Sequence, residues 1–253
     1  MTGTKIFITS LRNEGFAFLL FLGVWSIISI FYPVYVIPSP LAVISAFPGF
    51  LPDEFLHHLT VTACRIGVGF GVSFFVGSFI GILAFARKWE APVNALMAAL
   101  NILPGMILGV IFLLIFGIGH LTPIALVLFL TLPTLTINTI NNLSKRDVTL
   151  EQYLVSLGAK QKHILRYLYL PALVPTLLSN LSIGMGLAIK VVLMGEFIGS
   201  QDGIGYLLNA ARIYFNMKEV FFYLILLLVF TLIYQGILTL LANTVLRKYF
   251  YAG

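Results

Sequence analysis

The chain has 253 residues, of which 60% are hydrophobic and only 9% are charged. A soluble globular domain is about 25% charged, so this composition excludes an ordinary soluble protein and predicts a polytopic membrane protein. The formal net charge of +6 fits basic residues on the cytoplasmic side of a membrane better than nucleic-acid binding, and the single cysteine, Cys64, excludes an internal disulfide and cysteine-based metal clusters.

The first predicted element is a membrane span. Lys5 and Arg12 precede an apolar run that extends from Phe16 to about Pro38. The run is too long for the apolar region of a secretory signal peptide, and no convincing small-residue cleavage site follows it. We therefore expect a first span that is retained in the mature protein.

Five further apolar runs follow the first. A transmembrane helix needs about 20 largely apolar residues, and helices are required because open sheet edges leave backbone groups unsatisfied in lipid. The sequence therefore predicts an all-α polytopic membrane protein with one transmembrane domain over residues 1–253. The six transmembrane helices are expected near residues 16–37, 61–86, 93–116, 121–142, 173–198 and 220–245.

The distribution of basic residues predicts the orientation of these spans. With a cytoplasmic N-terminus, eleven of the 15 Lys and Arg residues fall in cytoplasmic segments, whereas the outer loops hold only Arg212 and Lys218. Basic residues concentrate on the cytoplasmic side of membrane proteins, so both termini are expected in the cytoplasm. The cytoplasmic set comprises Lys5, Arg12, Arg87, Lys88, Lys145, Arg146, Lys160, Lys162, Arg166, Arg247 and Lys248.

One long charged stretch, at about residues 143–171, connects the fourth and fifth spans. Thr149 followed by Gln152 fits a capping box, which starts a helix, and Gly158 predicts a turn before a second helix that leads into the fifth span. The first helix has an apolar face at helical spacing, made of Leu150, Tyr153, Leu154 and Leu157. This face requires a partner, either lipid headgroups or another protein.

Lys190 is the most informative single residue, because it lies deep in the predicted fifth span. A charged group inside a bilayer is costly and faces a cavity or a partner. We expect Lys190 to face a translocation pathway and to favour an anionic solute. The alternatives are a pair with Glu196 or another carboxylate, or a span placed so that Lys190 reaches the interface. Six residues rotate a helix by about 240°, so Lys190 and Glu196 do not share a face.

Three further polar residues of the spans are candidates for the pathway or for structural contacts. Glu196 is expected to form an ion pair with an arginine such as Arg65 or Arg212, and the alternative is a part in an outer gate. Arg65 has the same two interpretations. Asn138, near the inner end of the fourth span, either lines a polar path or hydrogen-bonds between helices.

The sequence contains no recognisable constellation of an enzyme. It has no Gly-rich loop followed by Gly-Lys-Ser/Thr, so it does not bind ATP in that way. The adjacent His57 and His58 do not form a His-Glu-x-x-His zinc motif and are expected in a loop. We therefore expect no metal, no cofactor and no catalytic residue in this chain, and energy for transport would come from another chain.

Several stretches together resemble one family of membrane proteins. They are "IPSPLAVISA", "HLTVTACRIGVGF", "LIFGIG", "SLGAKQKHILRYLYLPALVP" and "GEFIGSQDGIGYLL". They resemble permease subunits of ATP-binding cassette importers, in the branch of nitrate, sulfonate, taurine, bicarbonate and thiamine-precursor permeases. Gly158 and the Leu170-Pro171 pair match the EAA motif of that family, with Gln152 at the glutamate position and Glu151 one residue before it.

The resemblance implies a type I importer permease in a bacterial-type inner membrane, and it covers nearly the whole chain. It implies that the loop is a coupling helix that docks on a separate ATPase, which binds ATP and Mg. The residues implied for this coupling are Glu151, Gln152, Leu154, Leu157, Gly158 and Ala159.

The resemblance also implies partners and a class of solute. It implies a second permease copy, an extracytoplasmic solute-binding protein and a surrounding lipid bilayer, with no nucleic acid. The solute would be a small anion such as nitrate, sulfonate, taurine or bicarbonate, or else a heterocycle like a thiamine precursor. The alternative from another class is an autonomous channel or secondary transporter, which would need no helix for docking an ATPase.

Overall fold

The computed structural model describes residues 2–46, 49, 54–145 and 148–245, and this part of the chain is helical with no strand. The predicted all-α class is therefore confirmed. The helices are α1 (Thr2–Ile30), α2 (Pro40–Ala46), α3 (Phe55–Ala86), α4 (Glu90–Asn101), α5 (Gly105–Phe116), α6 (Leu121–Ser144), α7 (Val148–Ser156), α8 (Gln161–Ile164), the π-helical turn η2 (Leu165–Tyr169), α9 (Leu170–Gly199), α10 (Ile204–Ile213) and α11 (Met217–Val245).

Four of the described helical runs are long and apolar enough to cross a membrane: α3, α6, the run from Lys162 through α9, and α11. The number becomes five if α4 and α5 together form one bent span. The apolar part of α1, Phe18–Ile30, is shorter than these runs. The predicted count of six spans is not confirmed and stays a prediction.

The third predicted span, residues 93–116, is not one continuous helix. α4 ends at Asn101, α5 begins at Gly105, and the two axes meet at 83°. Pro104 stands at the break with φ −65° and ψ 122°, an extended conformation that ends a helical path. Proline has no backbone N–H and cannot continue the i to i−4 hydrogen bonds of α4, which explains why the chain turns here.

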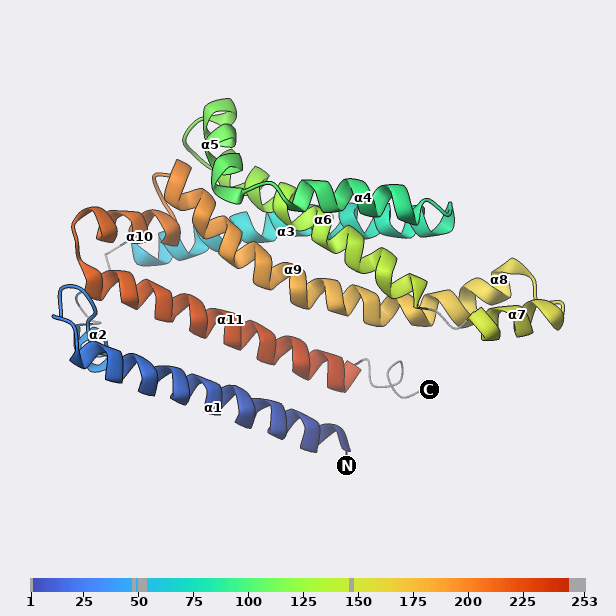
Figure 1. The fold of residues 1–253 in the computed structure, drawn as a ribbon, viewed down its shortest axis with the longest axis horizontal. Coiled ribbons are helices and arrows are strands. Elements are labelled where there is room, and N and C mark those ends of the chain that lie inside the picture. The colour runs from blue at the N-terminus through green and yellow to red at the C-terminus, as the bar shows by residue number, and fades with distance from the viewer. Residues whose placement is uncertain (1, 47–48, 50–53, 146–147, 246–253) are drawn as a thin grey trace.

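The core of the molecule is the packing of α6 between α3 and α9 (Figure 1). Small residues allow this close approach: a Cβ on Gly81 of α3 would lie 2.6 Å from the Thr139 Cβ, and one on Gly184 of α9 would lie 2.7 Å from Leu135 Cδ2. Leu126, Val127 and Leu135 of α6 are completely buried there. In a membrane, where lipid is as apolar as leucine, such close contact is what drives helices together.

A second, smaller cluster joins α1, α2, α10 and α11. The Trp25 ring of α1 stacks on Phe221 of α11 at 5.1 Å, and its indole N–H donates to the Pro38 carbonyl at 2.9 Å. α1 and α11 lie side by side along the core (Figure 1). α1 starts and α11 ends on the side toward α7 and α8 but well short of them, whereas α2 and α10 lie at the opposite end (Figure 1). These ends are called the α7 end and the α10 end below.

Candidate functional site

The charged loop folds as a helix, a glycine turn and a second helix, which confirms the predicted sequence of elements. α7 ends at Ser156, and Gly158 has φ +75°, the left-handed conformation that favours glycine. The Ala159 N–H then donates to the Leu154 carbonyl at 3.0 Å, which satisfies the end of α7. The start was predicted wrongly: α7 begins at Val148, so Thr149 lies inside the first turn and not at the N-cap.

The exposed apolar ridge of α7 consists of Leu150, Tyr153 and Leu157, which are 42%, 60% and 66% exposed. They lie at i, i+3 and i+7, so they share one helix face. All three belong to the predicted apolar face, whose fourth member is Leu154. Leu154 is half-buried, and it lies next to Leu150 and Leu157 on the helix surface because it is four residues after the first and three before the second.

Glu151 connects α7 to the core through Tyr169. The Tyr169 hydroxyl donates to Glu151 Oε1 at 2.9 Å, and the Tyr169 ring meets the Phe85 ring edge-on, with centroids 5.7 Å apart. Phe85 lies in the last turn of α3. Sequence reasoning missed Tyr169, since a contact between residues eighteen apart, across a turn, leaves no periodic signal. Of the other two residues implied for coupling, Gln152 is exposed and Ala159 is half-buried.

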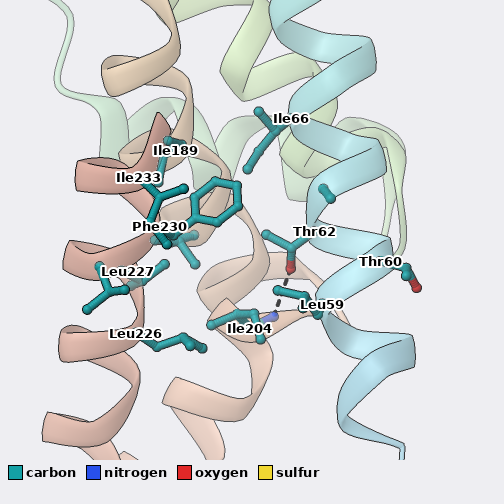
Figure 2. Close-up of a pocket in the computed structure, with 13 residues that line it drawn as sticks. Leu59, Thr60, Thr62, Ile66, Ile189, Ile204, Leu226, Leu227, Phe230 and Ile233 are labelled. Carbon is teal, nitrogen blue, oxygen red and sulfur yellow. Dashed lines mark hydrogen bonds between the residues drawn. The ribbon is translucent and has the colours of Figure 1, made fainter. Parts of the chain in front are cut away.

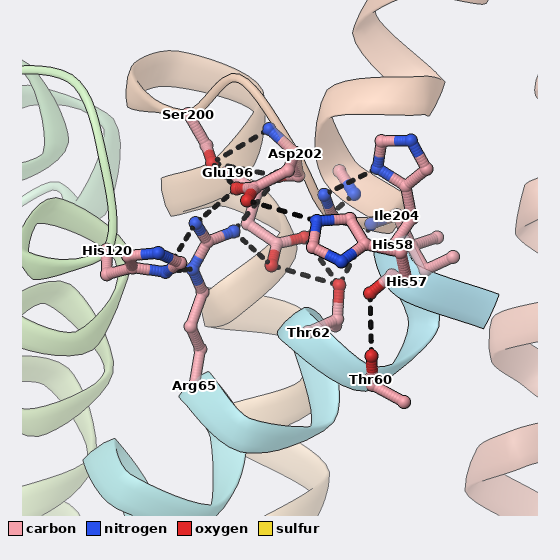
Figure 3. Close-up of polar contacts among 12 residues, drawn as sticks. His57, His58, Thr60, Thr62, Arg65, His120, Glu196, Ser200, Asp202 and Ile204 are labelled. Atoms are coloured by element: carbon pink, nitrogen blue, oxygen red, sulfur yellow. Dashed lines mark hydrogen bonds and ion pairs between the residues drawn. The ribbon is translucent and has the colours of Figure 1, made fainter. Parts of the chain in front are cut away.

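At the α10 end, a buried ion pair joins α3 to α9 (Figure 3). Arg65 Nη1 donates to Glu196 Oε1 at 2.9 Å, and both side chains are almost completely buried. This confirms the predicted pair of Glu196 with an arginine and identifies Arg65 as the partner. Arg212, the other candidate, instead donates to the Asn209 side chain at 2.9 Å and is exposed.

The same two groups hold the segment that follows α9. Arg65 donates to the carbonyl and the carboxylate of Asp202, and the Gly205 N–H at the start of α10 donates to Glu196 Oε2 at 2.9 Å. The Thr62 hydroxyl also donates to Glu196. Burial raises the pKa of Asp202, but the hydrogen bonds from Arg65 and Ser200 outweigh burial, so this pKa lies below its ordinary value.

The two histidines expected in a loop belong to the first turns of α3, which begins at Phe55. His58 is buried, and its Nδ1 accepts the Gly203 N–H at 3.0 Å. His57 lies 3.7 Å from the Asp202 carboxylate (Figure 3). His120, in the turn before α6, has its Nδ1 3.2 Å from Arg65 Nε. The three histidines thus join Arg65, Glu196 and Asp202 in one polar cluster, which no sequence motif predicted. Among the described residues, no group of three or more His, Cys, Asp or Glu could hold a metal ion.

Lys190 lies apart from this cluster, in the middle of α9, with an exposed side chain. No carboxylate of the described residues lies within 4 Å of its ammonium, and Glu196 is occupied by Arg65. Asn138 of α6 donates to Ser179 Oγ at 3.0 Å and to Asn180 Oδ1 at 2.8 Å, so it bridges α6 and α9. The structure therefore brings Arg65 and Glu196 together and leaves Lys190 and Asn138 at other depths.

An apolar pocket of about 380 Å³ lies between α3, α9, α10 and α11 (Figure 2). Leu59, Ile66, Ile204 and Phe230 line it. Thr60 and Thr62 also line it. The Thr62 hydroxyl accepts the Ile204 N–H at 2.9 Å and donates to Glu196. The pocket thus offers no ionic partner to a charged solute, and Lys190 does not line it.

Comparison with known proteins identifies relatives of this chain. The family described as "binding-protein-dependent transport system inner membrane component" matches residues 73–247. The formylaminopyrimidine transport permease protein ThiX of Halalkalibacterium halodurans is 27% identical over 206 residues, which cover 81% of this chain and 82% of that protein. The putative aliphatic sulfonates transport permease protein SsuC of Bacillus subtilis is 28% identical over 188 residues, covering 74% of this chain and 68% of the relative.

A solved structure of the MetNI methionine ABC transporter, in an inward-facing conformation, has a similar fold. The TM-score is 0.63 with 20% sequence identity, and the match covers 77% of this chain and 95% of the compared chain. At this level of identity the similarity concerns the fold alone.

Proposed function

The chain belongs to the family of binding-protein-dependent transport system inner membrane components, and from this premise we propose how it couples to its ATPase and which solute it carries. It is a permease subunit of an ATP-binding cassette importer with a MetI-like fold, a multi-pass inner-membrane protein that works with ATPase subunits. Energy comes from that ATPase, which binds ATP and Mg.

The proposed docking element is the loop of about residues 143–171, with α7 as the coupling helix. The observation that carries this proposal is the exposed ridge of Leu150, Tyr153 and Leu157, in the loop that carries the long charged stretch of the chain. Apolar anchors at i, i+3 and i+7 suit a helix that lies in a groove of a partner protein. A helix lying on the lipid surface is the alternative.

Movement of the docked helix would reach the membrane through two routes. The Gly158 turn passes directly into the helical run that becomes α9. The contact of Glu151 with Tyr169, and of Tyr169 with Phe85, ties α7 to the adjacent end of α3. A displacement of α7 by its ATPase would therefore move α3 and α9 together.

The proposed solute is a small anion, because Lys190 places a positive charge within a span where no described carboxylate neutralises it. An anionic solute fits the relative named for aliphatic sulfonates. A heterocycle is the second candidate, favoured by the relative named for formylaminopyrimidine transport.

The remaining partners follow from the family name and from charge. A binding-protein-dependent system requires an extracytoplasmic solute-binding protein, and we propose that a second copy of this chain completes the pathway. Both termini are assigned to the cytoplasm by the basic residues. α1 starts and α11 ends on the side of the molecule that faces the α7 end, and this direction supports the assignment (Figure 1).

The coupling proposal is tested with a matched pair of α7 variants. Leu157→Asp places a charge on the ridge, whereas Val155→Asp places the same charge on an equally exposed residue of the opposite face, 57% exposed. We expect Leu157→Asp to reduce co-purification of the ATPase subunit with the permease by about ten-fold or more, as for an interface anchor, and Val155→Asp to leave it unchanged. Equal ATPase recovery and equal ATP hydrolysis in the two variants would contradict docking through this ridge.

A further inference from the structure

We infer that Lys190, Asn101 and Thr134 form an oxyanion-binding site inside the membrane, beside the break between α4 and α5. This inference rests on the proposed role of the chain as a transport pathway and names the class of group that the pathway binds. The three residues come from three helices, α9, α4 and α6.

The position of the site follows from the packing around Gly105, the first residue of α5. A Cβ on Gly105 would lie 2.7 Å from the Met194 methyl of α9 and 3.0 Å from Leu130 Cδ1 of α6. α6 and α9 run in opposite directions, so the next residues toward the α7 end on these same faces are Lys190, four before Met194, and Thr134, four after Leu130. Lys190 therefore points to the side of α9 on which α4 and α5 meet.

The hydrogen bonding of Asn101 and Thr134 favours an anion. Thr134 Oγ1 donates to Asn101 Oδ1 at 3.3 Å, which occupies the amide carbonyl and leaves the amide N–H groups of Asn101 as donors. Among the described residues, no group accepts a hydrogen bond from this amide nitrogen. An ammonium and an amide NH2 are both donors, and a group with several acceptor oxygens, such as a sulfonate or a carboxylate, satisfies both.

A polar path leads from this site toward the α7 end. Asn138 lies one turn from Thr134 on the same face of α6 and contacts Ser179, which shares the face of Lys190 on α9. In α4, Asn94 lies two turns before Asn101, and its buried Oδ1 is without a hydrogen-bond partner among the described residues.

Toward the α10 end, the same faces become apolar. Met194 and Leu130 close on Gly105, and Ile198 Cδ1 lies 2.7 Å from where a Cβ on Gly109 would stand. The proposed site is thus the last polar position before an apolar closure. The alternative to an oxyanion site is a polar contact between these residues and a second permease copy, which would shield them from water. The experiment below distinguishes these two alternatives.

The test measures the reactivity of cysteines in membranes that contain the complete importer. Asn101→Cys is made in a Cys64→Ser background, because Cys64 is exposed, and Thr134→Cys serves as a second reporter if Asn101→Cys fails to assemble. Each is treated with an anionic reagent, sulfonatoethyl methanethiosulfonate, and with a cationic one, trimethylammonioethyl methanethiosulfonate. The control is Tyr214→Cys, at a residue 82% exposed between α10 and α11.

We expect both reporters to react, with an anionic-to-cationic rate ratio that falls about five-fold or more when Lys190→Gln is added, because a nearby ammonium attracts the anionic reagent. The ratio at Tyr214→Cys should not change. Unreactive reporters, or a ratio that Lys190→Gln leaves unchanged, would overturn the site. The proposed importer function is judged by a separate result, which is co-purification of the ATPase subunit with the unsubstituted permease. If the ATPase subunit co-purifies, the importer function is supported even when the oxyanion site is not; if it does not, the importer function itself is contradicted.

Discussion

At the scale of single residues, the best-determined feature is the buried pair of Arg65 and Glu196. A buried ion pair is stable only when its remaining donors and acceptors are also satisfied. Here the Thr62 hydroxyl and the Gly205 N–H both donate hydrogen bonds to the Glu196 carboxylate. The Asp202 carbonyl accepts a hydrogen bond from Arg65. Each charge is therefore compensated, and the pair fixes the segment between α9 and α10 onto α3. This arrangement supports a structural role for both residues.

Removing one member of the pair leaves the other charge buried and unpaired. Arg65→Met is expected to destabilise the protein by about 3–5 kcal/mol, and the unfolding midpoint of the detergent-solubilised complex measures the loss. Arg212→Met is the control, because Arg212 is exposed. Within the described part of the chain, its side chain donates hydrogen bonds only to the side chain of Asn209. Its effect should stay within about 0.5 kcal/mol. An unchanged midpoint in Arg65→Met would show that the pair contributes nothing.

At the scale of elements, the glycines of α3 belong to two different faces. Gly69, Gly77 and Gly81 lie against α6, whereas a Cβ on Gly67 or Gly71 would meet nothing within 4 Å. The open face is available to lipid or to a second copy of the chain.

This difference gives a matched pair of substitutions in one helix. Gly81→Ala would bring a methyl group to 2.6 Å from the Thr139 Cβ, and such overpacking costs about 1–3 kcal/mol. Gly71→Ala adds the same methyl group in open space. We expect a lower unfolding midpoint for Gly81→Ala only. If the two variants unfold at the same temperature, α3 and α6 are less tightly packed than described here.

At the scale of the whole molecule, the fold separates two tasks between its ends. The α7 end carries the exposed ridge and the glycine turn, and α1 starts and α11 ends on the side toward it (Figure 1). The α10 end carries the polar cluster around Arg65 (Figure 3). Lys190 lies between them in α9. The helices that connect the ends, α3, α6 and α9, pack as one core, which supports the proposed transmission of movement from the α7 end.

The proposed orientation is tested in intact cells with a membrane-impermeant maleimide. In the Cys64→Ser background, Tyr214→Cys at the α10 end should be labelled from outside, because that end is assigned to the extracytoplasmic side. Val155→Cys in α7 should be labelled only after the membrane is permeabilised. The reverse labelling pattern would place the α7 end outside and would be incompatible with docking of a cytoplasmic ATPase.

The sequence by itself determined the membrane class, the helical fold and the glycine turn at Gly158. Each of these follows from local properties: the length of apolar runs, the backbone demand of lipid and the conformational freedom of glycine. It also identified Arg65, Glu196 and Lys190 as important, since charges in apolar runs are conspicuous. Only the tertiary structure decided that Arg65 pairs with Glu196 while Lys190 stays exposed, and that Leu154 is half-buried while Tyr153 and Leu157 are exposed. Those outcomes depend on how helices far apart in the chain rotate and pack, and no local pattern encodes that rotation.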